Sequence, residues 1–157
     1  MSLTDLLVLV TALGAATVGG VFFGFSSFVM RALAQLPAAQ GVAAMQRINV
    51  VVLNAGFLGV FMGTALLAAV CVGVSLMAWS GQRSLWLLAA GLLYLVGTFV
   101  VTVAFNVPRN ERLARMDGSS SDAAAHWPVY VLEWTRWNHV RTAAALASAA
   151  CALMVLS

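Results

Sequence analysis

The chain has 157 residues, of which 62% are hydrophobic and only 8% are charged. About 25% of the residues in a soluble domain are charged, so this composition excludes an ordinary soluble protein and indicates an integral membrane protein. The net charge of +3 is too small for nucleic-acid binding. The basic residues are all arginine, and we expect them to contact lipid headgroups or a partner in the membrane.

The first membrane span is predicted over residues 6–30. Asp5 stands just before it, where an acidic residue favours the start of a helix, and the apolar run is too long for a cleaved signal peptide. Ala16, Gly20 and Gly24 recur every four residues along this span. Small residues at that spacing let a neighbouring helix approach closely, so we expect the span to pack through them.

Residues 31–47 interrupt the apolar pattern. Pro37 and Gly41 are helix breakers, and the segment should form a short amphipathic piece at the membrane interface. The second span is predicted over residues 49–79, with Asn49 at its start and facing the bundle. A buried asparagine needs a hydrogen-bond partner, and the sequence leaves open whether Asn49 has a packing role or a site role.

A hydrophilic turn at residues 80–84 makes the third span, predicted over residues 85–106, an antiparallel neighbour of the second. This span carries no charge, and its small and polar residues share one side: Gly91, Tyr94, Thr98, Thr102 and Asn106. Pro108 should end or bend the helix, and a short surface helix and a polar loop should follow.

The stretch from Trp127 to Thr142 concentrates aromatic and polar groups just before the last apolar run, and the fourth span is predicted over residues 128–156. On a helical wheel its side chains separate by face, with Tyr130, Trp134, Trp137 and Arg141 in one sector, Asn138 and Glu133 on its flanks, and His139 opposite.

The number of residues after Arg141 indicates how deep this side chain lies in the membrane. Only about sixteen uncharged residues follow Arg141, or roughly 24 Å of helix, whereas the hydrocarbon core is about 30 Å thick. Arg141 and Asn138 should therefore enter the membrane. The face below Arg141 continues with small residues, which indicates the bundle interior: Ala144, Ala145, Ser148 and Ala152.

The sequence thus predicts an all-α fold, a four-helix transmembrane bundle with up-down-up-down topology in one domain. One end carries Arg31, Arg47, Arg109, Arg112 and Arg115, whereas the turn at the other end carries Arg83. The positive-inside rule then places the arginine-rich loops in the cytoplasm and both termini outside a plasma membrane.

Four segments of the chain resemble a known family: FVMRALAQLP, AMQRINVVVLN, FNVPRNERL and WTRWNHVRT. They are similar to segments of a bacterial and fungal family of small four-helix membrane proteins that includes the fungal anthrone oxygenases. Its NVPxN and W-x-x-x-N-x-x-R elements match Asn106 to Asn110 and Trp134 to Arg141. The resemblance implies oxidation of an anthrone to an anthraquinone by O₂, with no cofactor.

Cofactor-free oxygenation needs a base, positive charge for the substrate anion and a dry aromatic site. As a hypothesis, the catalytic residues are Glu133 as base and Arg141 and Asn138 as holders of the anionic oxygen, together with Asn106. His139 is the alternative base if the helix is rotated from this arrangement. The expected substrate-binding residues are Asn49, Asn106, Asn110, Tyr130, Trp134 and Trp137. The expected ligand is a small hydrophobic molecule or a lipid, with no nucleic acid, and a homo-oligomer is compatible with the sequence.

Other interpretations stay open. The tryptophans and Tyr130 could form an interfacial aromatic belt, and Arg141 could simply pair with Glu133 or with backbone carbonyls. His126 and His139 would lie about 20 Å apart on one helix, too far to share a metal ion, although a single histidine could ligate haem. The alternative function is a non-catalytic binding module or accessory subunit holding a lipid, a quinone or a partner helix. A transporter ranks third, because the spans lack paired ionisable residues.

Overall fold

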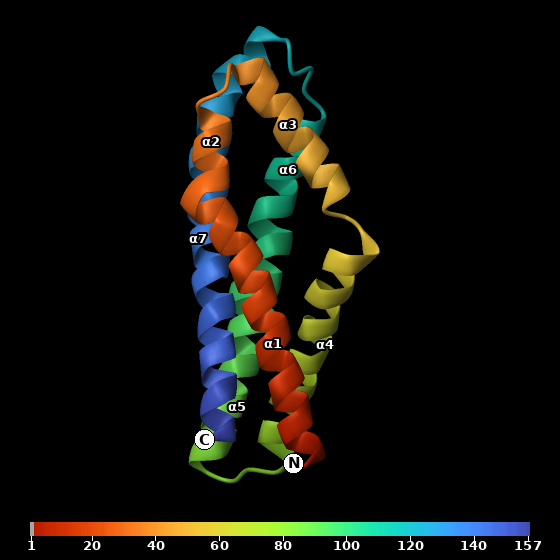
Figure 1. Ribbon diagram of the computed structural model, residues 1–157, viewed down its shortest axis with the longest axis vertical. Helices are drawn as coiled ribbons and strands as arrows, with labels where there is room; N and C mark the ends of the chain where they lie inside the picture. Colours follow the sequence, from red (N-terminus) through yellow and green to blue (C-terminus); the bar gives the residue numbers. More distant parts are fainter. Residues whose placement is uncertain (1) are drawn as a thin grey trace.

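The computed structural model describes residues 2–157 and shows long helices lying side by side along one axis (Figure 1). In chain order the elements are α1 (Leu3–Gly24), η1 (Phe25–Val29), α2 (Met30–Ala34), α3 (Ala38–Val51), α4 (Ala55–Met77), α5 (Gln82–Leu92), η2 (Leu93–Val100), η3 (Thr102–Asn106), α6 (Val107–Ala114) and α7 (Ser121–Leu156), where η denotes π-helix. The prediction of an all-α, four-helix bundle with alternating direction is confirmed, and both termini lie at one end.

Three of the four membrane-spanning rods are longer than a bilayer requires. Continuous helices cover Leu3–Ala34, Gln82–Ala114 and Ser121–Leu156, which have 32, 33 and 36 residues. With α4 as the second rod, these are the first, third and fourth rods. At 1.5 Å per residue each is about 50 Å long, compared with a hydrocarbon core of about 30 Å. The three rods therefore extend beyond the membrane at the end opposite the termini.

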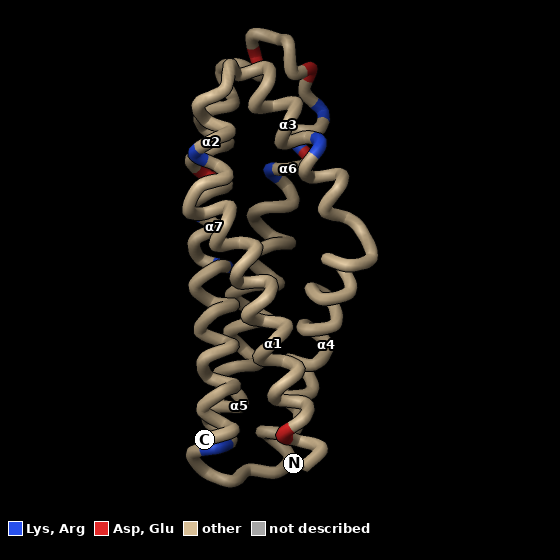
Figure 2. The backbone as a smooth tube through the Cα atoms, viewed as in Figure 1, with Lys and Arg blue, Asp and Glu red and all other residues tan. Residues whose placement is uncertain are grey.

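At that end α3 lies across the extended rods and forms a cap with them (Figure 1). The cap has its own apolar core, which contains Met30, Val42, Met45, Leu113, Trp127 and Tyr130. Charged residues gather in the cap and at the terminal end, whereas most of the length between them carries none (Figure 2). This distribution fits a membrane-embedded middle with two polar ends.

Local capping fixes the first helix. The Ser2 hydroxyl accepts from the Asp5 N–H, and the Asp5 carboxylate accepts from the Ser2 N–H, which forms a capping box. Asp5 also pairs with Arg83 in the first turn of α5. The acidic residue thus starts α1, as the sequence indicated, and also ties it to its neighbour.

The second span begins at Ala55, six residues later than the expected Asn49. Asn54 causes the difference, because its Oδ1 accepts from the Phe57 N–H at 3.0 Å and its Nδ2 donates to the Val51 carbonyl at 3.0 Å. It therefore caps α4 and closes α3. Asn49 belongs to α3 in the cap and does not share a helix with the glycines of α4.

Two expected helix breakers lie inside helices. Gly41 is part of α3, where a Cβ atom would lie 2.7 Å from Trp127 Cζ2, so its role is to let α3 lie against α7. The third rod also runs through Pro108 to Ala114. Pro108 sits in the first turn of α6, directly after the π-helix η3, where a residue without an N–H is tolerated.

The small-residue stripe of α1 does not pack inside the bundle. Ala16 and Gly20 are exposed, and a Cβ added at Gly20 would meet nothing within 4 Å. The helix instead contacts α7 through a neighbouring face, where a Cβ at Gly19 would lie 2.8 Å from Leu146 Cδ2. Periodicity alone does not distinguish these faces, because lipid is as apolar as the bundle interior.

Candidate functional site

The centre of the site is the guanidinium of Arg141, which α7 directs into the bundle. Its residue is only 6% exposed. Nε donates to Asn138 Oδ1 at 2.8 Å, and Nη1 lies 3.4 Å from Thr102 Oγ1. The guanidinium carbon stacks 3.8 Å from the centroid of the Phe22 ring and 4.8 Å from that of the Trp134 ring. Side chains of three rods therefore surround the cation.

Arg141 has no acidic partner. None of the salt bridges formed by residues 2–157 includes it. A buried charge is normally paired, because its desolvation is costly, and cation–π contacts with Phe22 and Trp134 compensate only in part. The arrangement is therefore a fixed, desolvated positive charge that an anion would stabilise.

Asn138 holds the guanidinium in place. It is fully buried, and its Nδ2 donates to the Phe22 carbonyl at 2.7 Å and to Ser26 Oγ at 2.6 Å, while its Oδ1 accepts from Arg141. The side chain thus links α7 to α1 and η1. One carboxamide sets both the spacing of two rods and the direction of Arg141.

The NVPxN element supports the aromatic face of α7. Asn110 Oδ1 accepts from the Tyr130 hydroxyl and from Trp134 Nε1, each at 2.8 Å. Asn106 Nδ2 donates to the Trp134 carbonyl at 3.2 Å, and its Oδ1 is buried without a hydrogen-bond partner. Trp134 is therefore oriented by both asparagines, and its ring in turn contacts Arg141.

The structure does not bring all the expected residues to one point. Of the asparagines expected at the site, only Asn138 forms a hydrogen bond with Arg141. Asn49 lies near the Tyr130 hydroxyl in the cap, and its Nδ2 is buried without a partner.

Glu133 and Trp137 also lie outside the Arg141 cluster. The Glu133 carboxylate accepts from Arg109 Nε at 3.0 Å, and its side chain is 46% exposed. The Trp137 ring stacks on Phe105, with the ring centroids 3.5 Å apart. Glu133 thus lies on the flank of α7, as the helical wheel indicated, and its partner is Arg109.

Sequence reasoning missed Phe22 and Ser26, which complete the cluster from the first rod. Phe22 lies in a uniformly apolar helix, so composition gives no signal for it. All three π-helical segments, η1, η2 and η3, contact α7. π-Helical turns are rare and occur often at functional sites, and only the coordinates reveal them.

An aromatic surface continues from the guanidinium toward α4. The Phe22 ring lies 6.2 Å from the ring of Phe57 and 6.4 Å from that of Phe61, and Phe61 stacks on Phe99 with centroids 5.5 Å apart. Phe57 and Phe99 are only partly buried, and α4 has no buried residue before Phe61. Flat apolar faces thus extend from the buried charge to the lipid-facing side.

Replacing Asn138 with leucine should destabilise the protein. The change leaves the Phe22 carbonyl, Ser26 Oγ and Arg141 Nε without their partner, and we expect the free energy of unfolding to fall by about 1–3 kcal/mol. Reversible unfolding in mixed detergent micelles measures this. An unchanged unfolding midpoint would show that the Asn138 contacts do not hold the rods together.

The fold and the site define a class: a multi-pass helical membrane protein with a buried, unpaired cation set among aromatic rings. The family model described as anthrone oxygenase matches residues 50–151, more than half of the chain, and the chain belongs to this family. The matched segment includes Asn106, Asn110, Trp134, Asn138 and Arg141. The chain matches no curated protein and no solved structure.

Proposed function

We propose that this protein oxidises a flat aromatic ketone of the anthrone class with O₂, and that Arg141 binds the anionic oxygen of the deprotonated substrate. The observation that carries the proposal is the guanidinium itself, which is buried between aromatic rings and has no acidic partner. It lies within the segment that matches the family. The anionic substrate would supply the missing charge, and its rings would extend the aromatic surface.

The chemistry needs no redox group from the protein. An anthrone carries a CH₂ group between two aromatic rings and opposite a carbonyl, so loss of a proton gives an anion whose charge lies largely on the carbonyl oxygen. The anion reduces O₂ by forming a C–O bond, and the resulting peroxide takes up a proton. The hydroperoxide then loses water to leave a second carbonyl, so one anthrone and one O₂ give one anthraquinone and one water.

The protein accelerates this sequence by stabilising the anion. Preorganised positive charge in a water-poor site has a large effect on such reactions, because it costs no reorganisation during the reaction. Asn138 fixes the direction of the guanidinium, and Phe22 and Trp134 provide flat faces beside it. We propose that the proton leaves to water before the anion binds, because the expected base, Glu133, is paired with Arg109.

Glu133→Gln tests this assignment against the expectation that Glu133 is the base. If water takes the proton, the rate of anthraquinone formation should change by less than about fivefold, because the Arg109–Glu133 ion pair is only partly buried and such pairs contribute about 0–1 kcal/mol. The measurement is the steady-state rate at saturating O₂ across pH 6–9. A loss of activity in this variant with its fold intact would instead identify Glu133 as the base.

The proposed activity is tested with the purified protein in lipid vesicles. Anthrone should consume O₂ and form anthraquinone in a 1:1 ratio, faster than in vesicles without protein. The absorbance of the product and an oxygen electrode give the two rates independently. Equal rates with and without protein would contradict the proposal.

A non-catalytic binding module is the second candidate, because an anionic lipid or quinone would also satisfy Arg141 without any reaction. Native mass spectrometry of the purified protein separates the two functions. A retained ligand together with no O₂ consumption would favour the binding module.

For the setting of the protein, we propose a plasma membrane with the arginine-rich cap in the cytoplasm. Labelling of Ser157→Cys in intact cells by a membrane-impermeant maleimide tests this orientation. Labelling only after lysis would show that the C-terminus faces the cytoplasm, which would contradict the proposed orientation.

A further inference from the structure

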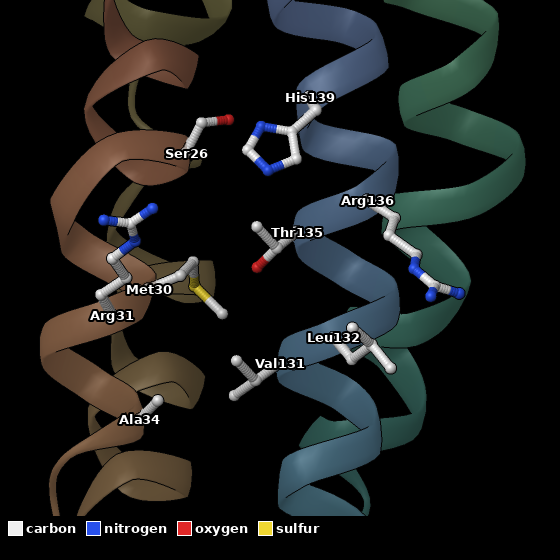
Figure 3. Close-up of a pocket in the computed structure, with 9 residues that line it drawn as sticks. All are labelled: Ser26, Met30, Arg31, Ala34, Val131, Leu132, Thr135, Arg136 and His139. Atoms are coloured by element: carbon white, nitrogen blue, oxygen red, sulfur yellow. The ribbon is translucent and has the colours of Figure 1, made fainter.

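A groove of about 250 Å³ runs between the first rod and α7 on the outer side of the bundle (Figure 3). Met30 and Ala34 line it from α2, and Val131 and Thr135 line it from α7. In Figure 3 the Met30 side chain and the Thr135 hydroxyl point into the gap between the two walls. Leu132 and Arg136 also line the groove from α7, and in this view the Arg136 guanidinium extends away from α2. The groove is separate from the Arg141 cluster, although Ser26 borders both.

The polar groups along this groove are basic or uncharged. Arg31 stands on the α2 wall and His139 on the α7 wall, and no acidic residue lines the groove. Both side chains belong to exposed residues, and neither takes part in a salt bridge with any part of the chain from Ser2 to Ser157. Thr135 Oγ1 is buried and has no hydrogen-bond partner. The groove thus offers positive charge and one unused hydroxyl beside an apolar floor.

The position of the groove along the bundle indicates what kind of molecule binds in it. Asp5 and Arg83 mark the polar boundary at the terminal end, and about 20 helical residues cross the hydrocarbon core from there. Counting from Asp5 along the first rod brings Ser26 to the opposite boundary and Arg31 into the headgroup layer. Counting back from Leu156 along α7 brings His139 to within about one turn of the same boundary.

We infer that this groove binds an anionic phospholipid, with its phosphate between Arg31 and His139 and an acyl chain continuing past Ser26 toward the hydrocarbon core. A phosphate complements two unpaired basic side chains and accepts from the Thr135 hydroxyl. The open side of the groove leaves the rest of the lipid in the bilayer. A second protein helix would instead place its own apolar side chains against unpaired basic groups.

The test is native mass spectrometry of the full chain titrated with phosphatidylglycerol and, separately, with phosphatidylcholine. The wild type should bind phosphatidylglycerol more tightly, and Arg31→Gln should weaken that binding about fivefold, the effect of one basic residue at an anionic surface. The double variant Arg31→Gln/His139→Gln should lose the preference. Arg47→Gln is the matched control, because Arg47 is an exposed arginine of the cap that does not line the groove.

Ala34→Trp provides an independent variant, since Ala34 is exposed and a large ring there would fill the groove. Binding of phosphatidylglycerol should fall, and circular dichroism should show an unchanged helical content. Equal affinity of the wild type for the two lipids would overturn the inference. So would an equal loss in Arg47→Gln and Arg31→Gln, or displacement of the lipid by inorganic phosphate alone.

Discussion

Arg141→Met should reduce the rate of anthrone oxidation by about 10²–10³-fold, the effect of removing one preorganised donor from an anion-stabilising site. The variant keeps an unbranched apolar side chain but removes the charged guanidinium. Initial rates of anthraquinone formation, corrected for autoxidation, measure the loss. The Michaelis constant should also rise if Arg141 binds the anion before the reaction.

The same variant should remain folded, which separates a functional role from a structural one. Arg141→Met removes a desolvated charge without an acidic partner, and that gain offsets the lost bond to Asn138. We therefore expect the free energy of unfolding to change by less than about 1 kcal/mol. Arg136→Met is the control, since Arg136 is exposed on the same helix. Full activity in Arg141→Met would contradict the proposed function.

Gly91→Ala should destabilise the contact between α4 and α5. A Cβ atom at Gly91 would lie 2.6 Å from Val72 Cγ2 and 2.7 Å from the Ala68 carbonyl oxygen. The carbonyl belongs to the backbone and cannot turn away, so the rods must separate. Overpacking of this kind costs about 1–3 kcal/mol, and thermal unfolding in detergent should show a lower midpoint.

Gly59→Ala is the matched control for that experiment. Gly59 lies on α4, and a Cβ atom there would meet nothing within 4 Å. The substitution should leave the midpoint unchanged or raise it slightly, because alanine favours helix more than glycine does. Equal destabilisation by the two variants would show that close packing at Gly91 is not what holds α4 to α5.

Prediction from sequence succeeded for polar side chains, because the cost of exposing a polar group to lipid decides which way it faces. The small residues below Arg141 on its face of α7 predicted that this face lies inside the bundle, and Arg141 and Asn138 are both buried. The polar ladder of the third rod was predicted from helical spacing, and its members Tyr94, Thr98 and Asn106 are buried. A charged or polar side chain must avoid lipid, so the helix face that carries it must turn toward the bundle interior.

The faces of apolar residues were not predictable in the same way. Ala16 and Gly20 point outward although their spacing is typical of a packing face. Phe22 could equally have faced lipid, yet it stacks on Arg141. In a membrane both environments favour such side chains, so hydropathy carries no information about direction.

By itself, the sequence determined a four-helix membrane bundle and a cation inside it, because bilayer thickness and the cost of burying charge constrain any chain of this composition. Only the tertiary structure decided which groups meet that cation. Asn138 reaches Arg141 because one helical turn joins them, whereas Glu133 turns to Arg109, which the third rod brings alongside it. Such pairings depend on how three rods rotate against one another, and that rotation is set by small-residue contacts such as those at Gly19 and Gly91.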